Sequence, residues 1–443
     1  MNLTALHYPS RFRRYFSVFL LVGALGAAAF RMAAAESPTR PAAGLIETTL
    51  VDAGASYYGT FQSHNQKVVA TPDGIFLTYS RQRVPPDAAD SAPEAALWRL
   101  VRSTDGGKTF QTVYESTHGT RAPVLEVDDA GRLFLAHPDW NDPRAPFFFY
   151  RFARGGDYHQ PSISVITNIS CAAKYAMAWD PTRRQFYIAA QYGQLVTVNP
   201  EGRLVEMRAA FRQTGPNAST QYPHLAVSPD GVLHLAMTTV GKTRQGKDIY
   251  WDIHYMNSPD GGRTWRKLDG TPLPASPVPD DTGPTDRITL DDEFEISTWL
   301  ASTLVKDGKV HFIYEGKTMH YLRYDLATGR KDATLDGPQF SGGNLTLGHA
   351  SGLLAARLDQ PGSPMFCVSR DRARQTLGCL MSRDNGRTWE AHSLAARTFH
   401  DNYATGGARQ VAGDGYLIGS FTEVAGPKRL EIWFYRIQTG PIR

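Results

Sequence analysis

Residues 103–110 read STDGGKTF, and this stretch decides the fold. The pattern S-x-D-x-G-x-T-[FW] recurs at residues 258–265 (SPDGGRTW) and 382–389 (SRDNGRTW). An aspartate at the start of a turn accepts hydrogen bonds from the backbone that follows it, and glycine supplies a positive φ. The threonine and the aromatic residue then begin a strand. Copies of one hairpin that lie far apart in the sequence indicate a repeat architecture.

Around these hairpins, the chain between residues 46 and 437 divides into seven units, each with an extended segment, a turn and a hydrophobic strand. The turns lie at residues 72–74, 128–131, 180–183, 229–231, 307–308, 360–363 and 413–415. Units of roughly 55 residues suit blades of four strands. We therefore predict an all-β, seven-bladed β-propeller without a helix of consequence, closed by the strand at 46–51. A six-bladed ring is the alternative, because the second and third units lack the hairpin motif.

The hairpin motif resembles the Asp-box, or BNR, repeat, which lies on the blades of β-propellers in sialidases and in several families that degrade polysaccharides. The resemblance implies the same propeller fold for this chain. It also makes glycans the first class of ligand to consider.

The N-terminal segment has the features of a signal peptide. Arginines precede an apolar run at residues 15–30, and the alanines at 33–35 offer a cleavage site. The run is short for a membrane span, so we expect cleavage, with an uncleaved anchor as the alternative. The predicted organisation is a signal peptide at 1–35, a linker at 36–45 and a single propeller domain at 46–443. The mature protein is then secreted or periplasmic, without stable membrane insertion.

The charge balance argues against one class of partner. The chain carries 47 Lys and Arg against 43 Asp and Glu, but removal of residues 1–35 leaves 43 of each. Without a basic patch, nucleic acid is not expected as a partner. We expect a monomer.

Two of the three cysteines, Cys367 and Cys379, flank a turn expected at residues 371–374. They could face each other across a hairpin and form a disulfide in an oxidising compartment. Two buried free thiols are the alternative. Cys171 stands alone, and no Cys/His spacing predicts a zinc site.

The starts of the predicted innermost strands carry many polar and ionisable residues. In a propeller these strands line a central channel, and ligands bind at one of its mouths. Counting ten residues back from the turn glycines of units one, two and four reaches His64, Arg121 and Gln221. We therefore expect His64, Arg121 and Tyr222 to share one layer around the mouth, where a His, an Arg and a Tyr form a candidate site.

We predict His64 as the catalytic base or acid, with Tyr222 or His224 as its counterpart. The candidates for substrate binding are Asn65, Arg121, Lys174, Tyr175, His349, Tyr403 and Arg409. The alternative is that these polar residues serve only the turns before the strands and that His224 belongs to the core.

Three reaction classes use such a site. Glycoside hydrolysis normally needs two carboxylates, but Glu293, Glu295 and Asp401 are not clearly paired, and the acidic run at 291–293 is expected to be a solvated loop. Sialidases carry Arg-Ile-Pro at the first inner strand, where this chain has NQK at 65–67. β-Elimination on a uronic acid needs a group that neutralises the carboxylate, a base and an acid. The His, Arg and Tyr rim suits elimination best.

The first unit carries a finer resemblance. Residues 62–69 (QSHNQKVV), 74–79 (GIFLTY) and 98–110 (WRLVRSTDGGKTF) resemble the opening of seven-bladed BNR proteins that act on L-rhamnose-α-1,4-D-glucuronate. Those proteins release terminal rhamnose from arabinogalactan side chains such as gum arabic. They have been described both as hydrolases and as lyases, and they are similar in fold to BNR-type ulvan lyases. Carried over, the resemblance implies that His64 is the catalytic histidine.

The expected function is therefore a secreted lyase that cleaves a terminal rhamnose-glucuronate linkage in an acidic polysaccharide or oligosaccharide. No cofactor is expected. Family similarity allows a structural Ca²⁺ ion, although no motif in this chain predicts one. A sialidase-like glycoside hydrolase and a non-catalytic glycan-binding propeller are the alternatives, because a fold alone does not establish a reaction.

Overall fold

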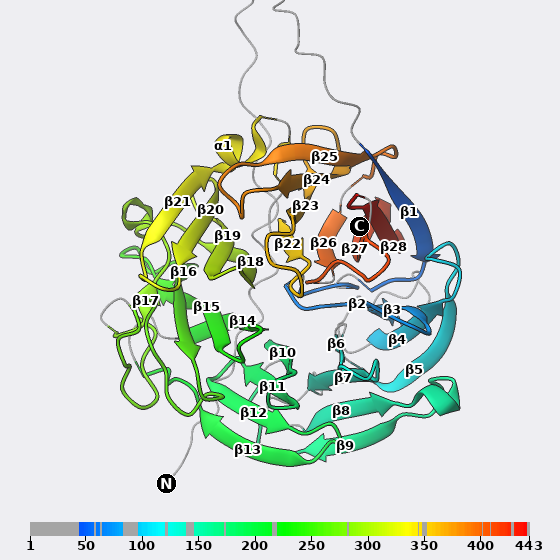
Figure 1. The fold of residues 1–443 in the computed structure, drawn as a ribbon, viewed down its shortest axis with the longest axis horizontal. Coiled ribbons are helices and arrows are strands. Elements are labelled where there is room, and N and C mark those ends of the chain that lie inside the picture. The colour runs from blue at the N-terminus through cyan, green and yellow to red at the C-terminus, as the bar shows by residue number, and fades with distance from the viewer. Residues whose placement is uncertain are drawn as a thin grey trace, which may run out of the picture. The chain divides into compact units, whose positions relative to one another are not determined.

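Antiparallel β-hairpins make up almost all of the regular structure (Figure 1). The computed structural model describes residues 44–440, with gaps at 57–58, 63, 83–95, 120–122, 139–145, 172–173, 215–218, 281–282, 344, 348–351, 401, 408 and 427–428. The predicted signal peptide at 1–35 and most of the predicted linker lie outside the described residues. In the described part, the helical segments are α1 (Gly337–Ser341) and the single turns Arg154–Gly156 and Asp291–Glu293. No described helix has the length and apolarity to cross a membrane.

Consecutive strands pair into four-stranded antiparallel sheets. The first sheet contains β2 (Val68–Thr71), β3 (Gly74–Gln82), β4 (Ala96–Ser103) and β5 (Gln111–Gly119). The second contains β6 (Val124–Val127), β7 (Leu133–Pro138), β8 (Phe147–Phe152) and β9 (Ser162–Ile166). The third contains β10 (Tyr175–Asp180), β11 (Gln185–Ala190), β12 (Gln194–Val198) and β13 (Leu204–Ala209).

The fourth sheet contains β14 (Ser219–Val227), β15 (Leu233–Lys242), β16 (Asp248–Ser258) and β17 (Asp286–Arg287). The fifth contains β18 (Trp299–Lys306), β19 (Lys309–Glu315), β20 (Met319–Asp325) and β21 (Lys331–Asp336). One half of the last sheet contains β22 (Leu353–Ala356), β23 (Met365–Asp371), β24 (Thr376–Ser382) and β25 (Glu390–Ala395). The other half contains β26 (Asn402–Gly407), β27 (Tyr416–Gly426), β28 (Arg429–Gln438) and β1 (Gly44–Asp52).

The strand at the N-terminal end of the described chain closes the arrangement. β1 is antiparallel to β28, with Ile46 opposite Ile437, and pairs in parallel with β25 over three residues. These contacts join the two halves into one eight-stranded sheet. As expected from the sequence, the first strand completes the last sheet, so the beginning and the end of this unit are held by one ladder of hydrogen bonds.

The innermost strands β2, β6, β10, β14, β18, β22 and β26 lie nearest the centre in Figure 1. The prediction of an all-β propeller is confirmed. Apolar clusters fill the spaces between neighbouring sheets: Trp98 of the first sheet and Tyr150 of the second, for example, pack with ring centroids 5.2 Å apart. Both faces of most strands are buried in this way, and eight of the ten residues of β15 are buried.

The three hairpin motifs share one hydrogen-bond pattern. In the first, the Asp105 carboxylate accepts hydrogen bonds from the motif threonine, at 3.0 Å from its backbone N–H and 2.6 Å from its hydroxyl. The Ser103 hydroxyl donates to Asp105 at 2.7 Å and accepts from the Gly107 N–H at 2.8 Å. The copies at 258–265 and 382–389 repeat these contacts. The recurring Ser, Asp, Gly and Thr thus form one closed turn.

The motif glycine also fits the hairpin against the preceding sheet. A Cβ on this glycine would overlap Phe434 in the first motif, Leu195 in the second and Tyr321 in the third. Its φ is also positive, at 90° for Gly107. Glycine is therefore required for two reasons, the backbone conformation and the close approach of the preceding sheet.

The two cysteines of the sixth unit are free thiols, so the alternative of two buried thiols is confirmed. Cys367 lies opposite Leu380, and Cys379 lies opposite Val368, in the β23–β24 pair. Directly opposite residues share a face and successive residues alternate. The two sulfurs therefore point to opposite faces of the sheet, into different apolar clusters, and cannot form a disulfide.

The acidic run at 291–293 is only partly the solvated loop that the sequence predicts. Asp291 and Asp292 are exposed, but Glu293 is 1% exposed. Its carboxylate accepts hydrogen bonds from the Tyr314 hydroxyl at 2.7 Å and from His320 Nε2 at 2.9 Å. The prediction was wrong for Glu293, which ties the long loop before β18 to the fifth sheet.

Candidate functional site

Three segments bring polar side chains to the channel mouth at which the innermost strands start, which we call the start side. They are residues 61–62 and 64–67 before β2, Lys174 before β10, and the first half of β14. The segment before β2 is held by backbone hydrogen bonds on both sides, from Thr78 N–H to Lys67 O and from Leu125 N–H to Gln66 O, both at 3.0 Å. The opposite mouth, formed by the turns that follow these strands, is the turn side.

Tyr222 lies in a β-bulge of β14. Gln221 is opposite Thr238 and His224 is opposite Ala236, so two residues of β14 face one residue of β15. Tyr222 has a φ of 48°, which non-glycine residues rarely adopt. A bulge redirects side chains, and backbone strain of this kind gathers at functional sites.

The imidazoles of His64 and His224 are stacked, with ring centroids 4.1 Å apart and planes inclined by 13°. The Tyr222 ring meets the His64 ring edge-on, at 6.2 Å between centroids. Within the described residues, neither histidine Nε2 has a hydrogen-bond partner. Buried polar atoms are normally paired, so these two nitrogens are the atoms that a ligand would be expected to engage.

Burial keeps both imidazoles neutral at pH 7. It lowers the pKa of His224 to about 3, and the charge of Arg409 acts in the same direction. The pKa of His64 also lies well below 6.5, first because of burial and then because of His224, Lys67 and Arg409. A neutral imidazole has one donor and one acceptor nitrogen. Each imidazole of the pair therefore has an unprotonated ring nitrogen, although its low pKa makes it a weak base.

Aromatic side chains surround Tyr222. The ring centroids of Trp299, Phe61 and Tyr250 lie 4.6, 5.7 and 5.9 Å from that of Tyr222. The Tyr222 and Tyr250 hydroxyls are 3.5 Å apart. The edge-to-face and tilted contacts fix the position of the Tyr222 phenol.

Cationic side chains lie around the histidines. The Lys174 ammonium is 4.7 Å from the Tyr222 ring centroid and donates a hydrogen bond to the Gln221 side chain. Lys67 is buried and donates to a backbone carbonyl at 3.1 Å, and burial lowers its pKa to about 7. Together with Arg409 they favour an anionic ligand, since charge-assisted hydrogen bonds to a carboxylate are the strong ones.

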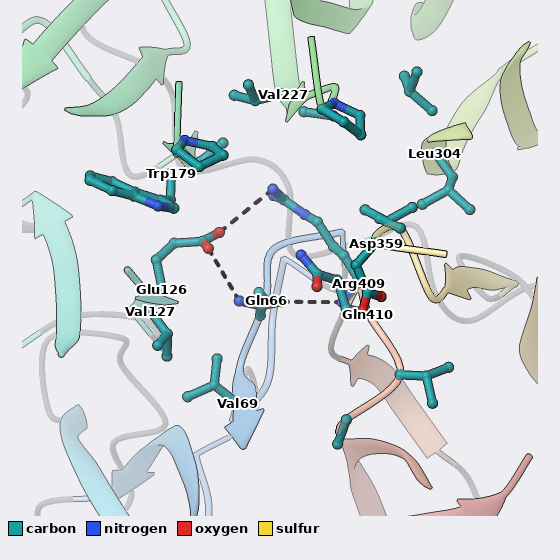
Figure 2. Close-up of a pocket in the computed structure, with 18 of the residues that line it drawn as sticks. Gln66, Val69, Glu126, Val127, Trp179, Val227, Leu304, Asp359, Arg409 and Gln410 are labelled. Carbon is teal, nitrogen blue, oxygen red and sulfur yellow. Dashed lines mark hydrogen bonds and ion pairs between the residues drawn. The ribbon is translucent and has the colours of Figure 1, made fainter. Parts of the chain in front are cut away.

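Arg409 links the start side to the turn side. Its charge acts on both histidines, and its side chain lines the turn-side cavity. Its guanidinium lies 3.6 Å from the Glu126 carboxylate. The Gln66 side chain completes the cluster: it accepts from the Arg409 backbone N–H at 3.2 Å and donates to Glu126 at 3.3 Å (Figure 2). Burial raises the pKa of Glu126 to about 7, against the opposing effect of Arg409.

Two predicted substrate-binding residues are engaged with the protein itself. Asn65 is 1% exposed, and its amide donates to the Tyr175 carbonyl at 2.6 Å and to Gln62 at 3.0 Å. The Tyr175 hydroxyl donates to the Ala136 carbonyl at 2.6 Å and accepts from the Val124 N–H at 3.2 Å. Asn65 joins the segment before β2 to the third sheet, and Tyr175 joins the third sheet to the second, so their geometry supports a structural role.

The structure brings together His64, Tyr222, His224 and Lys174, with Arg409 beside them. Arg121 and His349 lie outside the described residues, and so does the side chain of Tyr403. The proposed roles of these three residues stay predictions.

Sequence reasoning missed several residues of this region. Trp299 starts an innermost strand, so the rule that selected His64 could have found it. Tyr250 lies on the third strand of its sheet, and only the fold brings it next to Tyr222. Glu126 lies inside β6 and Lys67 directly precedes β2, and both occur in apolar runs that read as ordinary strands. No local signal distinguishes these two from exposed charges.

This arrangement can bind an anion, accept a proton at imidazole nitrogen and donate a proton from a phenol. These are the functions that general acid–base chemistry on an acidic ligand requires. Among the described residues, no group of three or more His, Cys, Asp or Glu could hold a metal ion. The structural Ca²⁺ ion stays a prediction.

No protein-family model matches the sequence, and no curated protein matches it. Solved structures do share the fold. One is an ulvan lyase of polysaccharide lyase family PL25 bound to -[GlcA(1-4)Rha3S]-, at 11% identity and a TM-score of 0.58, covering 86% of this chain and 94% of that chain. Another is the polysaccharide lyase Uly1, at 10% identity and a TM-score of 0.57, covering 88% and 93%. At such low identity, the similarity shows the fold alone.

Proposed function

We propose that this chain is a polysaccharide-active lyase that cleaves next to a uronic acid, with terminal L-rhamnose-α-1,4-D-glucuronate as its substrate. The observation that carries the proposal is the stacked His64–His224 pair, whose unpartnered Nε2 atoms lie beside Tyr222 and cationic side chains. The predicted signal peptide makes the enzyme secreted or periplasmic. The shared fold with a lyase solved on a glucuronate-rhamnose unit supports the substrate class.

Substrate binding would activate the histidines. The glucuronate carboxylate would pair with Lys174, which makes the C5 proton more acidic. A negative charge beside the imidazoles favours their protonated form and would raise their pKa from the low values that burial imposes. The bound substrate itself would thus turn a weak base into an effective one.

The elimination step would use His64 as the base and Tyr222 as the acid. His64 Nε2 takes the proton from C5, the electron pair of that bond forms the C4–C5 double bond, and the bond from C4 to the bridging oxygen breaks. The Tyr222 hydroxyl gives its proton to that oxygen, which leaves with rhamnose. Afterwards a proton passes from the imidazolium to the phenolate through solvent. The products are free rhamnose and an unsaturated uronate.

The test is incubation of the purified mature chain with gum arabic, with free rhamnose followed by chromatography and unsaturated uronate by near-ultraviolet absorbance. We expect both to rise. Rhamnose without absorbance would replace elimination by hydrolysis. Absence of both products would contradict the substrate, and saturable binding of the glycan without turnover would then identify a binding propeller.

His64→Ala tests the site within the same assay. We expect a loss of about 10²–10⁴-fold in rate, the range that general acid–base catalysis contributes. The matched control is His392→Ala, because His392 lies on the outermost strand β25 and its Nε2 atom contacts the Gln438 carbonyl at 2.8 Å. Equal activity of the two variants would remove His64 from the mechanism.

A further inference from the structure

The turn side of the channel holds a cavity of about 560 Å³ that the proposed reaction does not use. The ends of the innermost strands and the turns after them line it, including Val127, Trp179, Val227 and Val305. Neither His64 nor Tyr222 lines this cavity. It therefore lies at the opposite end of the innermost strands from the stacked histidines.

The polar floor of this cavity is the cluster of Glu126, Arg409 and Gln66 (Figure 2). The Glu126 side chain is 10% exposed, and its Oε1 atom has no hydrogen-bond partner among the described residues, although the Arg409 guanidinium lies 3.6 Å away. The Arg409 side chain is 20% exposed. The floor thus offers an unsatisfied hydrogen-bond acceptor, Glu126 Oε1, beside the N–H donors of the Arg409 guanidinium. Leaving a buried carboxylate oxygen unpaired is costly, and a hydroxyl-bearing ligand would relieve that cost.

An aromatic wall adjoins this floor. Trp179 lines the cavity next to Glu126 in Figure 2. Its indole N–H donates to the Asp129 carboxylate at 3.0 Å, and its ring packs on Phe186 at 4.7 Å between centroids. Both contacts hold the indole in place. A fixed aromatic surface beside a few convergent polar groups is the usual composition of a site for a small polar molecule.

The charge of this mouth is opposite to that of the start side. Glu126, Asp128, Asp129 and Asp359 line the cavity, and Arg409 is its cation. Asp128 is paired with Arg132, and Asp359 with Arg357. The carboxylates of the rim disfavour an anionic sugar, whereas the lysines near the histidines favour one.

We propose that this cavity is a second carbohydrate site, which binds a neutral monosaccharide unit through two adjacent hydroxyl groups. One hydroxyl donates to Glu126 Oε1, the neighbouring hydroxyl accepts from the Arg409 guanidinium, and the apolar face of the sugar ring lies on Trp179. The two mouths of the channel thus hold different parts of a glycan, an acidic end at the start side and a neutral unit at the turn side. The second site does not depend on the reaction at His64.

A further hollow extends this site outward. A cavity of about 600 Å³ between the fourth and fifth sheets shares Ser228, Pro229, Val305, Leu358 and Asp359 with the turn-side cavity. The two cavities therefore border on the same residues. A chain of sugar units attached to the bound one would have room to leave the channel in this direction.

The first test is an NMR titration of the ¹⁵N-labelled mature chain with D-galactose and L-arabinose, and separately with D-glucuronate. The Trp179 indole resonance, assigned with Trp179→Phe, reports on the site without any change to the floor. We expect a saturable shift with a neutral sugar at millimolar concentration and a weaker response to glucuronate. No saturable shift of this resonance with either neutral sugar, or tighter binding of glucuronate there, would overturn the proposal.

Variants then locate the binding. Glu126→Gln and Trp179→Ala should each weaken neutral-sugar affinity by about tenfold, the loss expected for one charge-assisted hydrogen bond or one stacking surface. His64→Ala should leave this affinity unchanged, even though it is expected to lower the rate of turnover by about 10²–10⁴-fold. Unchanged binding in Glu126→Gln, or binding lost in His64→Ala, would overturn the second site. Because sugar binding is measured without turnover, failure of the lyase proposal does not decide this result.

Discussion

The imidazole rings of His64 and His224 lie face to face, with centroids 4.1 Å apart, although His64 comes from the segment before β2 and His224 from β14 of the fourth sheet. Burial and the charges of Lys67 and Arg409 keep the pair neutral. Two rings this close interact strongly, so a proton on one disfavours a proton on the other. The pair should therefore hold one proton at a time, as a base that cycles between neutral and singly protonated forms requires.

The two histidines should act as a unit. We expect His64→Ala and His224→Ala each to lower kcat/KM on the rhamnose-glucuronate substrate by about 10²–10⁴-fold. The double variant should be no worse than the more harmful single variant, because residues that act together are not additive. Steady-state kinetics of the three variants test this, and losses that multiply in the double variant would contradict a shared role.

Tyr222→Phe should remove the acid and keep the aromatic packing. The ring contacts with Trp299, Phe61 and His64 do not involve the hydroxyl. We expect kcat to fall by roughly 10²-fold or more while the thermal midpoint and KM change little. Differential scanning fluorimetry and kinetics on one preparation measure both. A Phe variant with full kcat would show that another group protonates the leaving oxygen.

Part of this site follows from the sequence, and the reason is local. The turn glycines fix where each innermost strand starts, so counting from them placed His64 and Gln221 on the same mouth, where Lys174 now connects Gln221 to Tyr222. The bulge at Tyr222 was not predictable in this way. It depends on the register with β15, a partner that single-strand patterns do not describe.

The stability of the fold should decrease in mild acid. His224 has a folded-state pKa of about 3 against an ordinary value of 6.5, so the unfolded chain binds more protons between these values. Stability from this group is fully present above pH 6.5 and is lost as the pH falls toward 3, with a slope of about 1.4 kcal/mol per pH unit. Buried His234 and His311, whose pKa values burial lowers to about 4 and about 3, act in the same direction.

Urea unfolding at pH 7, 6 and 5 measures this dependence. The wild-type free energy of unfolding should fall steadily as the pH is lowered. The free energy of unfolding of His224→Gln should fall less steeply, by the slope that corresponds to about one bound proton. A free energy that stays constant over this range would contradict the buried, neutral state of these histidines.

Gly107→Ala should destabilise the fold beyond the cost of its positive φ. The added methyl would overlap the Phe434 ring of the neighbouring sheet. The matched control is Gly246→Ala, where φ is 79° against 90° but no atom lies within 4 Å of the new Cβ. The free energy of unfolding of the control should fall by about 1 kcal/mol, because of backbone strain alone. The free energy of unfolding of Gly107→Ala should fall by roughly 1–3 kcal/mol more, because of overpacking. Equal losses of the free energy of unfolding in the two variants, measured by urea unfolding, would show that the hairpin is not closely packed against the preceding sheet.

Glu126 and Arg409 should be coupled. Arg409→Leu leaves the buried Glu126 carboxylate without its cation and should cost about 3–5 kcal/mol at pH 8, where Glu126 is ionised. The double variant Glu126→Leu with Arg409→Leu should recover most of this loss. A double-mutant cycle measured by urea unfolding gives the coupling, and strictly additive losses would contradict the ion pair.

The Glu126–Arg409 cluster shows what the sequence could not predict. Glu126 alternates with apolar residues inside β6, as an exposed strand residue would, and Arg409 follows the strand β26 near the other end of the chain. Only the closure of the sheets around one channel brings them together with Gln66. The cysteines show the same limit, because the sequence placed them in one hairpin but the one-residue offset in register decided that they cannot bond.

The most direct measurement is the ratio of unsaturated uronate to free rhamnose released from gum arabic by the purified mature chain. The elimination mechanism predicts one unsaturated uronate, seen by near-ultraviolet absorbance, for each rhamnose seen by chromatography, and release of both products about 10²–10⁴-fold more slowly by His64→Ala. Rhamnose released without absorbance, or released equally by His64→Ala, would contradict the account.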